Sequence, residues 1–533
     1  MPELSQETKN LIKNYKNYRQ LLQPKEGVLT IHVDEIASKV ASFYEKIRGV
    51  VEWREEHLLR KTAIERILKR RLLLKKSGEV IAEAFIQELI RGGHFPNDII
   101  EETKIETVQK IIDKYLFIIE NSSSFEGRTK THIYNWITGL ASCEIEETLS
   151  PPLKEKIMME YMMELMKERA RIITSRKSKI EISEEEINTQ LYIAIQQAVF
   201  RLDKTIVSYH LLLKKFPDWR NLTQEKIEQI TKNIHQIWDS IEKDLNHRLS
   251  GKFYNACEKY DTPYLILGDI INNNPDNAFQ ILEDPEALES EIKEVYQERL
   301  GKLKLKMKKA GIFSVVSIFI TKLLVAIAIE IPFDKYFSGG FDYFGLGINI
   351  VIPPLLMLFL ILTIRPPQKS NFQKVTMEVM KITYQRNKKD FYEIRILPKR
   401  GVIMNIMVDF FYLLSYIVTF GIIILGLTKI NFGIISQIIF IIFFCLIASA
   451  GVKIRESAKE LVIEERKETI LQSFVEIFSI PILRMGKWLS NQWSKYNIIV
   501  IFLNSLIDMP FQLFVEFFEH WRSFLKEKKE EIH

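Results

Sequence analysis

The sequence predicts an all-α, polytopic membrane protein with a large N-terminal cytoplasmic helical domain, four transmembrane helices and a C-terminal amphipathic helical hairpin. Three observations lead to this prediction. Four apolar runs each contain the roughly 20 residues that a helix needs to cross a hydrocarbon core about 30 Å thick. Lys and Arg gather on alternate connections between these runs. In the N-terminal half, apolar residues recur every three or four positions, as in amphipathic helices.

The best internal boundary of the N-terminal half is the polar stretch 174–183 (TSRKSKIEIS). Such a stretch between helical patterns is typical of a linker. We therefore expect a first cytoplasmic helical subdomain at 1–175, a second at 176–310 that leads into the membrane, a four-helix transmembrane domain at 311–451 with a cytoplasmic loop at 365–400, and interfacial amphipathic helices with a cytoplasmic tail at 452–533.

Two helix starts are marked in the N-terminal half. Ser183 and Glu186 form a capping box, in which the serine oxygen accepts from a free backbone amide and the glutamate returns the bond. Asp284 followed by Pro285 places an N-cap residue before a proline in the first turn. We expect the helix from Pro285 to continue through Lys309 into the first apolar run, which would couple the soluble domain rigidly to the membrane.

The apolar runs predict helices because unpaired backbone amides in lipid cost several kcal/mol each. They are 311–331, 345–364, 401–427 and 430–451.

Basic residues set the expected orientation, because cytoplasmic loops carry the Lys/Arg excess. The loop 365–400 contains ten Lys/Arg and three Asp/Glu, whereas the two other connections hold only Lys335 and Lys429. Both termini are therefore expected in the cytoplasm, with the protein in the inner (cell) membrane. The composition, rich in Lys, Ile, Asn and Glu, is typical of a low-GC bacterial genome. The residues expected to contact the anionic inner leaflet are Lys302, Lys304, Lys306, Lys308, Lys309, Arg365, Lys399 and Arg400.

Two charges lie deep inside the apolar runs, Lys322 in the first and Asp409 in the third. Charges at such depth are costly and indicate function or a partner. We expect an ion pair between them, either as a proton or ion relay or as a structural pair that sets helix register. Glu330 lies near the outer boundary, where it is expected to reach water. Pro353 and Pro354 are expected to kink the second helix.

The C-terminal segment has two amphipathic stretches, which predict an interfacial hairpin that is partly re-entrant. In the alternative, a fifth crossing at 496–518, the basic residues that follow would lie outside, against the charge rule. A polar stripe with a spacing of four follows the last stretch: Asn504, Asp508, Gln512, Glu516 and His520.

No nucleotide-binding, zinc-protease, hydrolase or kinase motif is present in the sequence, and no catalytic residue, cofactor or metal site is predicted. The three cysteines are widely spaced and indicate no disulfide framework. A net charge of +6 suits an anionic lipid surface better than nucleic acid. The prediction is a membrane-anchored helical binding or scaffold protein, with a protein partner at its cytoplasmic domain and a homo-oligomer as a candidate assembly. The alternative is an ion or small-solute transporter or channel subunit that uses the Lys322–Asp409 pair.

Overall fold

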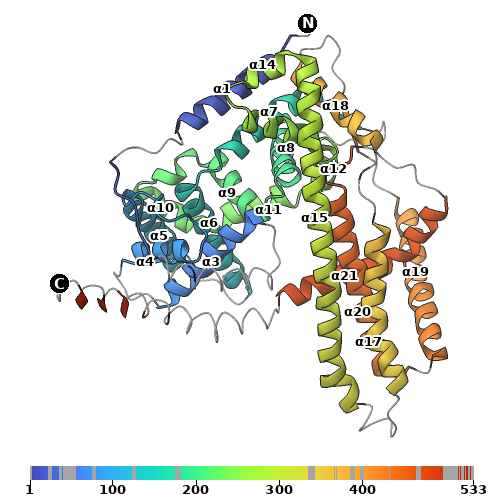
Figure 1. The fold of residues 1–533 in the computed structure, drawn as a ribbon. Coiled ribbons are helices and arrows are strands. Elements are labelled where there is room, and N and C mark those ends of the chain that lie inside the picture. Colours follow the sequence, from blue (N-terminus) through green and yellow to red (C-terminus); the bar gives the residue numbers. More distant parts are fainter. Residues whose placement is uncertain are drawn as a thin grey trace.

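The computed structural model (Figure 1) is almost entirely helical over the residues that it describes. These are 3–21, 27–34, 39, 56–74, 80–122, 128–174, 182–333, 343–364, 367, 369–384, 391–396, 401–430, 432–463, 470–495, 514, 517, 521–522, 524–525 and 528–529.

The elements of the soluble part precede and include the start of one very long helix. They are α1 (Gln6–Leu21), α3 (Glu56–Leu74), α4 (Ala82–Arg91), α5 (Thr103–Asn121), α6 (Arg128–Leu149), α7 (Leu153–Arg169), β1 (Ala170–Thr174), α8 (Glu184–Val199), α9 (Lys204–Lys215), the 3₁₀ helix η1 (Pro217–Asn221), α10 (Gln224–Lys232), α11 (Ile234–Leu245), α12 (Ser250–Glu258), α13 (Asp261–Asn273), α14 (Ala278–Glu283) and α15 (Pro285–Val325).

The remaining elements are mostly apolar. They are the π-helical segment η2 (Ala326–Glu330), α17 (Tyr343–Thr363), α18 (Lys369–Thr383), β2 (Tyr392–Ile396), α19 (Val402–Lys429), α20 (Ile434–Ala458) and α21 (Ile470–Lys495).

The soluble part has two hydrophobic cores, and their membership does not follow the expected boundary at 175. One core joins α1, α7, α8, α12, α13, α14 and the first half of α15. The other joins α3 to α6 with α9 to α11. Helix α8 belongs to both, because Leu191 lies in the first core and Ile193, two positions on, lies on another helix face in the second. The capping box that starts α8 is confirmed.

Of the segment expected as a cytoplasmic loop, 365–400, the described parts 369–384 and 391–396 contribute to the first core. Val375, Val379 and Ile382 of α18 are buried there. Strand β2 pairs in parallel with β1, with Ala170 opposite Tyr392 at the start of the register. The all-α class is correct, but this two-stranded sheet was not foreseen. It joins segments more than 200 residues apart in the chain, so local patterns carry no sign of the pairing.

Helix α15 confirms the expected continuous connection. It begins at the Asp284 cap, whose side chain accepts from the Glu286 amide, and its helical path runs on through η2 to Phe333, 49 residues in all. At 1.5 Å per residue that path is roughly 70 Å long. In Figure 1 it extends from the soluble domain along the full height of the apolar helices. The soluble domain and the first apolar helix are therefore one rigid unit.

Among the residues that the structure describes, three helices are long and apolar enough to cross a membrane: the one from Pro285 to Phe333, α19 and α20. Helix α17 is also apolar, with a stretch of 347–363, and continues through Pro353 and Pro354. Helices α15, α17 and α20 pack together. Gly451 and Gly311 lie at these crossings, because a Cβ at either glycine would meet a side chain of α17. Small residues of this kind let membrane helices approach closely.

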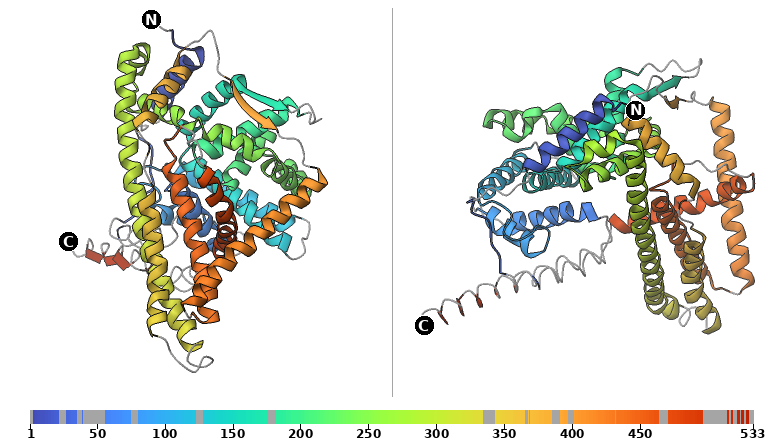
Figure 2. Two further views of the ribbon diagram at one scale, coloured as in Figure 1. Left: turned by 90° about the vertical axis from the view of Figure 1, so that its right-hand side faces the viewer. Right: turned by 45° about the horizontal axis from the view of Figure 1, so that its top comes forward.

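Helix α21 crosses the middle of α20 and also contacts α19 (Figure 2). A Cβ at Gly486 would overlap the backbone carbonyl of Cys445, which lies halfway along α20. The Thr419 hydroxyl on α19 donates to the Phe478 carbonyl at 3.1 Å. Helix α21 is thus level with the middle of the apolar helices rather than with their ends. The stripe residues Asn504, Asp508, Gln512, Glu516 and His520 lie outside the described residues.

Candidate functional site

A buried ionic centre lies among the apolar helices. The ammonium group of Lys322 on α15 pairs with Glu330 at the end of η2, and both side chains have no exposed surface. Asn349 of α17 donates from Nδ2 to the second carboxylate oxygen of Glu330 at 2.9 Å. The Phe443 ring of α20 lies beneath the lysine, with its centroid 5.3 Å from Nζ. Three packed helices therefore build one polar centre in an apolar layer.

The π-helical segment explains how two residues on one helix meet here. In a regular helix, positions eight apart differ by about 80° and lie on different faces, whereas positions seven apart lie nearly in line. At η2 the Ile331 amide bonds to the carbonyl of Ala326, five residues back, so the bulge absorbs one residue. Glu330 consequently occupies the face that carries Lys322. Such bulges occur frequently at functional sites.

The expected pair between Lys322 and Asp409 is wrong. Asp409 is exposed on α19, and within the described chain no cation lies at ion-pair distance from it. The reason is tertiary: α19 packs chiefly on α21, away from the face of α15 that carries Lys322. Glu330 was expected to reach water and is instead fully buried. A spacing of eight residues does not predict an ion pair in a regular helix, and the sequence does not indicate the bulge that brings Glu330 to Lys322.

Asn349 leaves one acceptor of this centre unused. Its side chain is 1% exposed, and its Oδ1 has no hydrogen-bond partner among the residues that the structure describes. Exchanging the amide oxygen and nitrogen would turn oxygen toward the Glu330 carboxylate, which is unfavourable. The oxygen is therefore available to a hydrogen-bond donor or cation that enters the centre.

A second candidate site is a cleft of about 1470 Å³ between the N-terminal helices, the middle of α15 and the C-terminal end of α20. Its membrane-side end is lined by Lys309, Phe313 and Lys453. Its inner end is lined by Glu146 and His210. It is larger than the roughly 300–1,000 Å³ usual for small-ligand pockets. The end of the cleft between α15 and α20 is therefore cationic and partly apolar.

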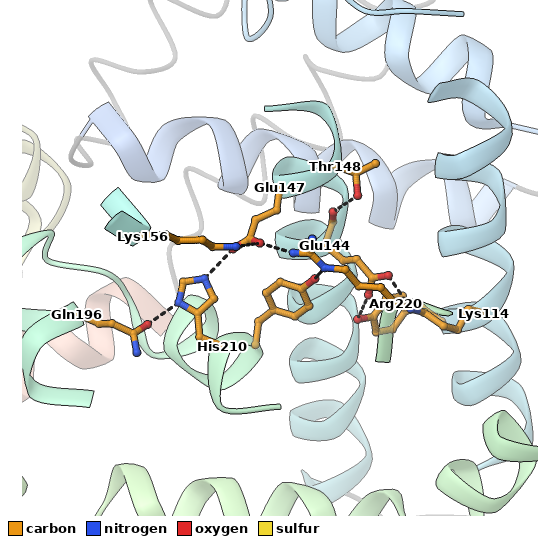
Figure 3. A network of polar contacts seen from close by, with 10 residues as sticks. Lys114, Glu144, Glu147, Thr148, Lys156, Gln196, His210 and Arg220 are labelled. Atoms are coloured by element: carbon orange, nitrogen blue, oxygen red, sulfur yellow. Dashed lines mark hydrogen bonds and ion pairs between the residues drawn. The ribbon is translucent and has the colours of Figure 1, made fainter. Parts of the chain in front are cut away.

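The inner end of the cleft contains a dense polar network (Figure 3). Glu147 accepts from His210 Nε2 at 2.6 Å and from Lys156 at 2.7 Å, and Arg220 also donates to it. His210 Nδ1 lies 2.5 Å from the Gln196 Oε1. The Gln196 amide nitrogen donates to a backbone carbonyl, which holds its oxygen toward the ring. The His210 imidazole therefore lies between two side-chain oxygens, one on each side of the ring.

Neighbouring carboxylates at this end have opposite pKa shifts. Burial raises the pKa of Glu146 to about 7. Burial acts in the same direction on Glu147, but the hydrogen bond and charge of His210, with the charge of Lys156, outweigh it and lower its pKa to about 2. Adjacent groups held in different protonation states are a pattern of acid–base sites, although ion-pair networks also produce it.

A second part of the network is structural. Glu144 accepts from Lys114 at 2.6 Å and from the Tyr115 hydroxyl at 2.7 Å. Tyr115 in turn accepts from the Trp219 indole at 2.8 Å. The groups are buried and mutually satisfied, so they lock α5, α6 and η1 together.

The residues expected to contact lipid are partly described. Lys302, Lys304, Lys308 and Lys309 are exposed on α15 where it leaves the soluble domain. Lys306 bonds to Glu460 at 3.1 Å, which ties α15 to the end of α20. The other three, Arg365, Lys399 and Arg400, lie outside the described residues. Among the described residues, no cluster of three metal-ligating side chains occurs.

Comparisons of this chain with protein-family models, with curated proteins and with solved structures found no match.

Proposed function

We propose that this protein is a membrane-anchored helical binding or scaffold protein whose soluble domain lies on the cytoplasmic side of four crossings. One observation carries the proposal: the first hydrophobic core includes the start of α15, α18 with β2, and Leu461 after α20. These segments enter or leave the apolar helices at three separate points in the chain. Because they share one core, they lie on one side of the membrane, in keeping with the basic clusters that they contain.

The unbroken helix α15 would transmit the effect of binding from the soluble domain to the apolar helices. A protein bound to the soluble part would act directly on the apolar helices, since no flexible linker intervenes along 49 residues. The Lys306–Glu460 and Arg201–Glu460 pairs, at 3.1 and 2.9 Å, brace the same junction. The exposed lysines of α15 would contact the anionic leaflet next to it.

Cysteine labelling in intact cells tests the topology. The native cysteines Cys143, Cys257 and Cys445 are buried, so an added one is read against a low background. Lys304→Cys should react with an impermeant maleimide only after permeabilisation, whereas Lys429→Cys should react from outside. Equal labelling of both positions in intact cells would contradict the four-crossing arrangement.

Photocrosslinking tests the binding role. Leu29 and Ile99 are exposed apolar residues of the soluble domain, 73% and 64% accessible. A photoreactive residue at either position should yield a discrete protein adduct in cells, and the same residue at Phe359 on α17, which is 68% accessible, serves as the lipid-facing control. If the soluble positions yield no protein adduct, the binding role is lost.

A second candidate function, a transporter or channel subunit, rests on the ionic centre at Lys322, Glu330 and Asn349. Buried charges in membrane helices mark ion pathways in many proteins. Glu330→Gln should abolish ion flux in proteoliposomes if the centre carries ions, while the exposed cytoplasmic Glu298→Gln should leave it unchanged. Absence of any flux by the unmodified protein would remove this candidate.

A further inference from the structure

A polar stripe runs along the outer face of α19. Asn405, Asp409, Tyr412 and Tyr416 follow one another at spacings of four, three and four, so they lie on one side of the helix. Asn405 and Asp409 are exposed, and the two tyrosine hydroxyls lie 3.3 Å apart. The rest of that exposed surface is apolar. A lipid-facing helix has no need of such a stripe, which indicates a different neighbour.

Asp409 is the member of the stripe whose transfer into lipid would be least favourable, because it carries a charge. It lies seven residues beyond Val402, the first residue of α19, or roughly 10 Å along the helix axis. A short carboxylate side chain at that depth does not reach the headgroups easily, and an unpaired charge inside the hydrocarbon layer is unfavourable. Over the part of the chain that the structure describes, it has no cationic partner.

Arg484 of α21 supplies the complementary charge on the same surface. Its guanidinium carbon lies 4.6 Å from the centroid of the Tyr412 ring, and the side chain is exposed. Stacking uses only the face of the guanidinium, which leaves its five N–H groups at the edge. Within the described residues, no carboxylate pairs with it. One exposed anion and one exposed cation therefore lie about one helical turn apart on a single face.

We propose that this face of α19 and α21 is the interface of a symmetric homodimer in which Asp409 of each copy pairs with Arg484 of the other. In a two-fold interface, each contact occurs twice, so both charges of both copies are satisfied. Two copies related by an axis normal to the membrane keep equivalent residues at equal depth. The dimer rests on the proposed embedding of α19 in the membrane, and failure of that embedding would show separately in the labelling experiment above.

Trans-complementation between full-length chains with different affinity tags tests this pairing. The unmodified chain should form a dimer in detergent micelles, measured by light scattering and by pull-down of one tag with the other. Asp409→Arg alone and Arg484→Asp alone should each lose self-association, since like charges then face each other. Co-expressed, they should associate again, because both contacts of the mixed dimer are opposite in charge.

The mixed pair distinguishes contacts between chains from a contact within one chain. A pair within one chain would leave both single variants defective when mixed, and that result would overturn the proposal. So would a monomeric unmodified protein. Lys232→Asp, an exposed charge change on α10, is the control and should not alter association. If the reversals prevent insertion, the neutral variants Asp409→Asn and Arg484→Gln should each raise the dimer dissociation constant about tenfold. An unchanged constant for both would also overturn the proposal.

Discussion

The bundle of α15, α17 and α20 and the outer helix α19 both contain charged side chains in an apolar layer, but only the bundle pairs them within the described chain. Lys322 is turned inward, completely buried and paired with Glu330. Asp409 is turned outward and exposed on a helix that packs mainly on α21. A charge in an apolar layer needs a partner. The first region supplies the partner within the chain, and we propose that the second takes it from another copy.

The largest expected effect comes from breaking the inward pair. Lys322→Met leaves the Glu330 carboxylate buried without its cation, and we expect a loss of about 3–5 kcal/mol in the free energy of unfolding. Chemical unfolding in detergent micelles measures this loss. Asp409→Asn should leave the stability of the monomer unchanged, because the exposed carboxylate has no described partner. A similar loss for both variants would erase the difference between the two regions.

Replacing both members of the inward pair sharpens the same comparison. Lys322→Leu with Glu330→Leu removes both charges, and apolar residues of similar volume often replace buried pairs at little cost. We expect a stability within about 1 kcal/mol of the unmodified protein. If the double variant is as unstable as Lys322→Met, the polar centre is needed for packing rather than for its charge.

A smaller effect is expected where α21 crosses α20. Gly486→Leu places a side chain against the Cys445 carbonyl, and overpacking of this kind costs typically about 1–3 kcal/mol. Gly421→Leu on α19 is the matched control, because a Cβ there would meet nothing within 4 Å. Thermal unfolding in micelles compares the two. Equal melting temperatures would mean that α21 does not rest on α20.

The last prediction concerns the pH dependence of the free energy of unfolding, through a carboxyl group buried in the soluble domain. Burial raises the pKa of Asp261 from 3.8 to about 7. Between these values the folded state holds a proton that the unfolded state has released, so stability falls as pH rises from about 4 to 7. Asp261→Asn should therefore gain stability over the unmodified protein above pH 7, by on the order of 4 kcal/mol, and show little gain near pH 4. The exposed Asp239→Asn is the control. A gain that does not change with pH would contradict this explanation.

Local signals predicted the elements well where one segment decides its own structure. The capping box of Ser183 and Glu186, the Asp284 cap and the unbroken helix beyond Lys309 are all observed. The apolar runs correspond to helices because apolar residues of that length satisfy their backbone internally. The placement of α18, β1 and β2 was missed, since it depends on contacts between segments hundreds of residues apart.

The candidate site shows the same limit at the level of single residues. Lys322 was recognised as a charge that needs a partner, but the partner chosen was Asp409. An ion pair with Asp409 would require a regular helix without a bulge and direct packing of α15 on α19. The bulge at η2 moved Glu330 onto the face of Lys322, and the position of α21 kept α19 apart.

The sequence by itself determined that this protein is helical, that it has apolar helices long enough for a membrane and that two charges lie within them, because composition and periodicity follow from short stretches of chain. Only the tertiary structure decided which carboxylate meets Lys322, which loop belongs to the soluble core and which charge remains exposed. Those outcomes depend on the direction in which each side chain points around its helix and on which helices pack together. A one-residue bulge is enough to change that direction.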